Sequence, residues 1–122
     1  MNWGQKRQGH IDLAIHNEGM LKELQSAPGN KFLDWRITVT FYVCVHAVDA
    51  KLASMNVAVS NHKSRKFHVS LRIGSVASDY FRIDSESRLA RYDPEYRSQL
   101  TLGRVQRFEQ MMQHVKSAVP IP

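Results

Sequence analysis

Four aromatic or polar side chains recur at helical spacing in one stretch of the chain: Trp35, Tyr42, His46 and Asp49. Their separations of 7, 4 and 3 positions would place them on one face of a helix, with His46 and Asp49 one turn apart. A carboxylate so placed orients an imidazole, fixes its tautomer and favours its protonated form, which suits a general acid or a phosphate-binding histidine. The alternative is an ordinary polar stripe on an amphipathic helix.

A second candidate is the basic segment from residue 60 to 72, which contains no acidic residue. Its basic side chains are His62, Lys63, Arg65, Lys66, His68 and Arg72. His62 and Arg65 are one turn apart near the start of a predicted helix, where anions are favoured. Clustered Lys and Arg supply most of the non-specific affinity of proteins for nucleic acids. The segment is therefore either a phosphate-contacting face or a solvated helix face.

The secondary structure of residues 34–56 decides how these side chains are placed. Residues 37–45 alternate in the manner of a strand, but no Gly or Pro marks an exit before Gly74. A helix accounts for the segment better, because an apolar stripe continues through it: Ile37, Phe41, Cys44, Val48, Leu52 and Met55. We predict one unbroken helix over 34–56, buried between other helices that compensate for its β-branched residues.

The rest of the chain also reads as helical. We predict helices over 10–26, with Asn30 as a cap for the next helix, and over 62–83, where Gly74 would allow close packing. Asp93 has the type of an N-cap and Pro94 that of a first helical residue, and the helix that they start, the last one, runs to about Ser117. The prediction is an all-α fold: one domain over 1–122, an antiparallel bundle of four main helices, and a short helical turn around "SESRLARY".

Composition narrows the function further. The net charge of +6 and pI near 9.8 favour encounters with polyanions. No phosphate-binding Gly-rich loop, G-x-S-x-G or His pair at i and i+4 is present, and the single Cys44 provides no metal-binding pair, so we expect neither a cofactor nor a metal site. The sequence shows no secretory signal and no apolar run of membrane-spanning length, and we expect a cytoplasmic protein without membrane contact.

Several of these segments occur in the order expected of one family. "DWRITVTFYVCVHAVDAKLA", then "SNHKSR" and "SRLARY", resembles a HEPN-like bacterial helical domain over roughly residues 10–118. The resemblance implies a bundle that commonly dimerises. Some members of that family are metal-independent endoribonucleases of toxin-antitoxin or defence systems, and others only bind nucleotides or RNA. This chain departs from the nuclease members: its one Arg-to-His pair at the permitted spacing, Arg107 and His114, has Phe108 after the Arg, and one such match is expected by chance.

The resemblance and the basic segment together suggest site residues. The catalytic candidates are His46, His62 and Arg65. The candidates for phosphate or RNA binding are Lys63, Lys66, Arg72, Arg91 and Tyr92. The expected partners are RNA or a nucleotide, a second copy of the chain, and an antitoxin. The alternative function is a non-catalytic helical interaction or dimerisation module.

Overall fold

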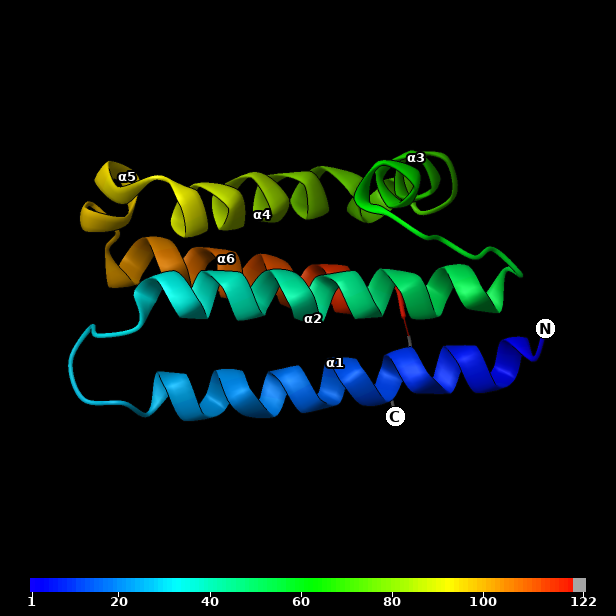
Figure 1. Cartoon of the computed structure of the whole chain (residues 1–122), viewed down its shortest axis with the longest axis horizontal. Coiled ribbons are helices and arrows are strands. Elements are labelled where there is room, and N and C mark those ends of the chain that lie inside the picture. Colours follow the sequence, from blue (N-terminus) through cyan, green and yellow to red (C-terminus); the bar gives the residue numbers. More distant parts are fainter. Residues whose placement is uncertain (120–122) are drawn as a thin grey trace.

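The computed structural model describes residues 1–119, and within that range its regular secondary structure is α-helix without any strand, which confirms the all-α prediction. Six α-helices follow one another along the chain (Figure 1): α1 (Trp3–Gln25), α2 (Leu33–Ser54), α3 (His62–Arg72), α4 (Gly74–Tyr92), α5 (Pro94–Ser98) and α6 (Leu102–Ser117). The segment whose strand-like alternation was ambiguous is α2, and it is unbroken.

The helix α2 lies at the centre of the molecule. It runs antiparallel to α1 and packs against α1, α3, α4 and α6 (Figure 1). Sixteen of its 22 residues are buried, including Ile37, Phe41 and Val48. Nearly all sides of α2 face other helices, so buried residues occur at both the odd and the even positions of residues 37–45. The β-branched residues among them produce the strand-like pattern. Tertiary packing thus offsets the low helix propensity of its β-branched residues.

The same helix is long and apolar enough to meet a length-and-hydropathy criterion for a membrane span. Of the 18-residue stretch that meets it, 78% is buried against the rest of the molecule. Core helices of soluble proteins meet this criterion too. Packing inside the molecule therefore accounts for the apolar character of α2.

Side-chain caps fix several helix starts. Asn2 accepts a hydrogen bond from the Gln5 amide, and Asn61 accepts one from Ser64. Asp93 accepts from two amides and Pro94 lies in the first turn, as predicted, but the helix that they start is the five-residue α5 and not the last helix to Ser117. Thr101, which the sequence analysis did not single out, caps α6. These caps stabilise the helix starts by about 0.5–2 kcal/mol each relative to alanine.

Four other predicted features of the elements were wrong. The single helix over 62–83 is two helices, because Ile73 at φ −131° and ψ 46° ends α3 and precedes α4. Gly74 makes no close approach, since a Cβ built there meets nothing within 4 Å. The short turn around "SESRLARY" is the second half of α4. Asn30 is not a cap, because Phe32 holds the N-cap position of α2 without a side-chain bond.

Candidate functional site

A buried ion pair joins α3 to α2 at the middle of the candidate site. Arg65 donates through Nε to Asp49 Oδ1 at 2.8 Å and through Nη2 to Oδ2 at 3.0 Å. The side chains are 11% and 5% exposed. A fork of this kind uses both oxygens of the carboxylate. The guanidinium is therefore committed to Asp49, and it is not available as the phosphate-binding group that the sequence suggested.

His62 occupies the first position of α3, directly beside this ion pair. Its Nδ1 is 3.1 Å from Arg65 Nη1. Since a guanidinium only donates, His62 Nδ1 must accept, and the ring is then the neutral tautomer with a proton on Nε2. Desolvation, followed by the charge of Arg65, lowers the pKa of His62. His62 is therefore placed to donate a hydrogen bond through Nε2, while its acceptor nitrogen is already in use.

His46 contacts a histidine that the sequence analysis did not select. The Nδ1 atoms of His46 and His10 are 3.1 Å apart, and the ring centroids are 5.3 Å apart with planes inclined by 25°. The centroid distance is close to the largest that this nitrogen contact permits, so the rings meet edge to edge through Nδ1. One proton lies between the two nitrogens, and one ring donates to the other. Desolvation lowers the pKa of both histidines.

His10 could have been found from the sequence with one further step. α1 and α2 form an antiparallel pair joined around Gly29, where φ is +70°. Residues at equal distances from Gly29 face each other in such a pair. His10 lies 19 residues before Gly29 and His46 lies 17 after it, so the two are less than one turn out of register.

Arg91 is surrounded by aromatic rings. Its Cζ lies 5.6 Å from the ring centroid of Phe41, 5.8 Å from that of Tyr42 and 5.4 Å from that of Tyr92. Nη1 donates to the Tyr42 hydroxyl at 3.0 Å, and Nε, which is buried, has no hydrogen-bond partner. Within residues 1–119, no ion pair joins Arg91 to a carboxylate.

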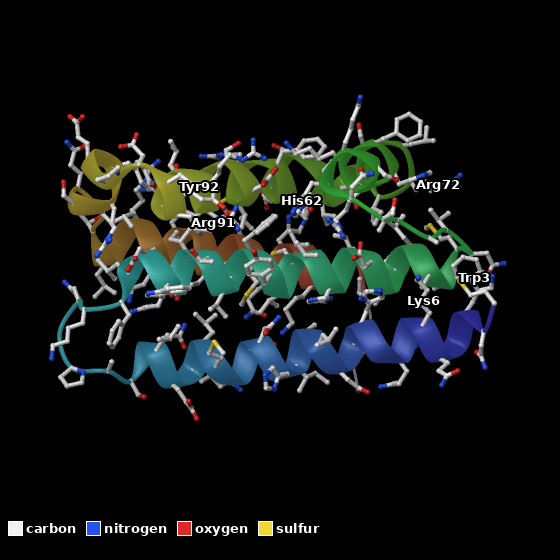
Figure 2. All side chains as sticks on the ribbon, in the orientation of Figure 1. Trp3, Lys6, His62, Arg72, Arg91 and Tyr92 are labelled. Carbon is white, nitrogen blue, oxygen red and sulfur yellow. The ribbon has the colours of Figure 1, made fainter. Side chains whose placement is uncertain are left out.

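Phe41 connects Arg91 to the start of α3, because the His62 ring is 6.0 Å from the Phe41 ring. Figure 2 shows His62, Arg91 and Tyr92 along α3 and α4, with Arg91 between α4 and α2. Exposed aromatic side chains flank them: Trp35 is 57% exposed and Tyr92 76% exposed. We call this surface the basic-aromatic face, defined by Trp35, Tyr42, His62, Arg91 and Tyr92.

A cleft of about 330 Å³ opens on the basic-aromatic face between α2, α4 and α5. Its lining includes Trp35, Arg91 and Arg97. Arg97 is held 3.5 Å from Asp34, and its side chain is 66% exposed. The cleft thus combines an exposed indole, two guanidinium groups and one carboxylate.

The remaining predicted phosphate ligands lie apart from this face or are already paired. Lys66 Nζ is 2.9 Å from Asp84, whose side chain is only 3% exposed. Arg72 is at the other end of α3, about 15 Å along the helix from His62, and donates to His68. Figure 2 shows Arg72 well away from Arg91. Lys63 is exposed on α3.

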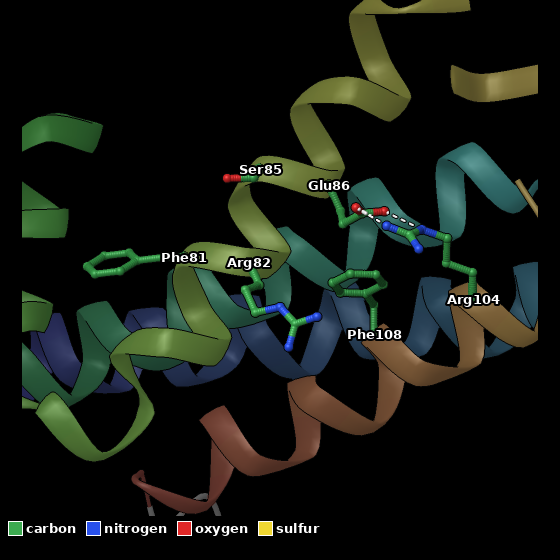
Figure 3. A pocket seen from close by; sticks show the side chains of 6 residues that line it. All are labelled: Phe81, Arg82, Ser85, Glu86, Arg104 and Phe108. Atoms are coloured by element: carbon green, nitrogen blue, oxygen red, sulfur yellow. Dashed lines mark hydrogen bonds and ion pairs between the residues drawn. The ribbon is translucent and has the colours of Figure 1, made fainter. Parts of the chain in front are cut away.

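A second cleft, of about 240 Å³, lies between α4 and α6 (Figure 3). Two arginines, Arg82 and Arg104, line it, and Arg104 is neutralised by Glu86 through Nε–Oε2 and Nη2–Oε1 contacts of 3.0 and 2.6 Å. The guanidinium also lies 5.7 Å from the Phe108 ring. This arrangement fastens α6 to α4 and leaves Arg104 no free donor fork for a ligand.

The predicted residues form two clusters that one contact joins. His46 and Arg65 lie around Asp49, His62 and Arg91 lie around Phe41, and the His62–Arg65 contact connects the clusters. The buried Cys44 adds no nucleophile, because burial raises the pKa of its thiol.

No family model, curated protein or solved structure matches this chain. The geometry of the basic-aromatic face is therefore the ground for assigning a function.

Proposed function

We propose that the protein binds single-stranded RNA at the basic-aromatic face. The observation that carries this proposal is Arg91, a guanidinium that lines the cleft, is held among three aromatic rings and has no carboxylate partner among the described residues. A phosphate oxygen or a base edge is the natural acceptor for a guanidinium without a carboxylate.

The exposed aromatic side chains support single-stranded ligands in particular. Trp35 and Tyr92 present rings on which unpaired bases can stack, and stacking contributes about 1–3 kcal/mol per base. Bases in a duplex are already stacked on one another and cannot use these rings. The net charge of +6 adds long-range attraction to the backbone, and His62 offers an Nε2 donor beside Arg91.

Metal-independent cleavage, toxin activity with an antitoxin partner, and homodimerisation are narrower proposals that rest on the HEPN resemblance. The resemblance also implies a four-helix antiparallel bundle, and we propose that the long helices α1, α2, α4 and α6 form it. Two contacts favour binding over cleavage: Arg65 is committed to Asp49, and the acceptor nitrogen of His62 is committed to Arg65. A general base would need that nitrogen free.

The proposal is tested by fluorescence anisotropy with a labelled 12-nucleotide single-stranded RNA. Arg91→Ala should weaken binding, and its log–log salt slope should fall by about 0.7, the value for one phosphate contact on a single strand. Arg107→Ala is the matched control, because it removes an exposed arginine from α6 and lowers the net charge by the same one unit as Arg91→Ala.

Trp35→Ala should weaken binding of the single strand and leave the salt slope unchanged, because stacking releases no counterions. Equal affinities for Arg91→Ala and Arg107→Ala would refute the site, since binding would then follow net charge alone. Cleavage of the same RNA in the presence of a chelator, lost in His62→Ala, would extend the proposal to the nuclease function.

A further inference from the structure

We propose that His10, His46 and Asp49 form a site for a divalent transition-metal ion of the zinc class, bridging α1 and α2. One ligand atom from each of the three residues lies within 4.8 Å of the others. The proposal is independent of RNA binding, because none of these residues belongs to the basic-aromatic face.

The two imidazoles already present their Nδ1 atoms to one another. In the structure they are 3.1 Å apart. Two nitrogens that each lie about 2.0–2.1 Å from a tetrahedral zinc ion are about 3.3–3.4 Å apart. A rotation of each ring by about 35°, the angle that a tetrahedral N–Zn–N arrangement requires, would therefore aim both Nδ1 lone pairs at an ion beside the N–N line. Neutral imidazole is the ligand form, and burial of both rings favours that form.

Asp49 can provide the third ligand without leaving Arg65. Arg65 donates one hydrogen bond to each carboxylate oxygen, and each oxygen keeps a second lone pair. Partners that hold a ligating carboxylate in this way are a regular part of metal sites. Asp49 lies one turn after His46, so the carboxylate is on the side of α2 that carries the imidazole.

The charges around the site determine how tightly it would hold an ion. Arg65 and Lys6 both act electrostatically on His10, and Lys6 lies on α1 toward α2 in Figure 2. These cations weaken affinity relative to a closed four-ligand structural site. Three protein ligands leave a coordination position for water, which is the pattern of an open site. We therefore expect an exchangeable ion that fastens α1 to α2.

The experiment uses the full chain without a histidine tag, stripped with a chelator and titrated with Co²⁺ and Zn²⁺. Co²⁺ should give the visible absorption of a protein-bound ion at about one ion per chain, and Zn²⁺ should raise the melting temperature. Loss of a ligand should weaken binding at least as much as loss of an outer-shell partner, about 10- to 100-fold. We therefore expect at least tenfold weaker binding in His10→Gln.

His16→Gln is the matched control, because it removes an exposed histidine from the same helix. It should bind both ions as the wild type does. His46→Gln provides a second ligand variant, and circular dichroism of each stripped variant checks its fold. Equal binding by His10→Gln and wild type would overturn the site, and so would absence of stoichiometric binding by the wild type, which would leave the histidines as a proton-sharing pair only.

Discussion

The residue that the structure reinterprets most is Arg65. Its position one turn after His62 was visible in the sequence, and the two side chains do touch. Its partner Asp49, 16 positions earlier on another helix, could not be assigned from spacing, because Asp49 was matched with His46 on its own helix. Local periodicity identifies side chains on one helix face, whereas a buried ion pair between helices depends on how the helices pack. Arg65 is thus a positioning residue for His62 and Asp49.

Arg65→Met and Asp49→Leu should each destabilise the protein strongly, by about 3–5 kcal/mol, because each leaves the other charge buried and unpaired. The double variant should lose much less than the sum of the two losses. Urea unfolding of the four proteins measures this coupling. Additive losses would show that the two side chains do not act as a pair.

His62 should make stability depend on pH. Desolvation, Arg65, Arg91 and Arg88 lower its pKa in the folded state, against the opposing charge of Asp84. The unfolded chain, with a histidine pKa near 6.5, then binds a proton that the folded protein does not. The stability that His62 contributes is therefore fully present above about pH 6.5, and it is lost as the pH falls from there through the lower pKa of the folded state.

His62→Gln tests this pH dependence, because the amide oxygen can still accept from Arg65 and has no pKa in this range. Its free energy of unfolding, measured in urea at pH 7.5 and 5.5, should fall less than that of the wild type. An identical fall in both proteins would show that His62 does not cause the pH dependence of stability.

At the scale of elements, the sequence predicts the helices well and their junctions poorly. The helix over 34–56 is confirmed as α2, which begins one residue earlier and ends two residues earlier than predicted. Asp93 and Pro94 do start a helix, but it is the short α5 and not the last helix. The break at Ile73 was missed because Ile is an ordinary helix residue, and the adjacent Gly74 was read as a packing residue. The turn geometry at Ile73 comes from the docking of α3 across α4, which no local pattern encodes.

The glycines at the two junctions should respond in opposite ways to alanine. Gly74→Ala should stabilise by about 0.4–1 kcal/mol, because its Cβ meets nothing within 4 Å and its φ is not positive. Gly29→Ala should destabilise by about 1–2 kcal/mol, since φ there is +70°. Thermal unfolding of both variants gives the comparison. A destabilised Gly74→Ala would mean that this junction needs glycine for another reason.

At the scale of the molecule, packing around α2 leaves α1 in contact mainly with α2. Its outer positions keep apolar side chains in solvent, with Leu13 at 44%, Ile15 at 48% and Met20 at 44% exposure. Between helices, ion pairs complete the assembly: Arg36 with Glu109 joins α2 to α6, and Lys116 with Glu18 joins α6 to α1.

From the HEPN resemblance we expect a homodimer. Light scattering at micromolar concentration should give a mass near twice the 14.0 kDa of one chain. A mass near 14.0 kDa over the whole concentration range would contradict this expectation.

The central position of α2 also bears on how the chain is made. Residues 37–45, "ITVTFYVCV", carry no charge, no Gly and no Pro, and have strong β-propensity, so in isolation they meet the description of a segment that forms cross-β aggregates. The helices α4 and α6 complete their cover, and α6 begins at Leu102, so a nascent chain holds this segment partly uncovered until α6 has left the ribosome. Truncation before α6 is therefore expected to yield insoluble protein.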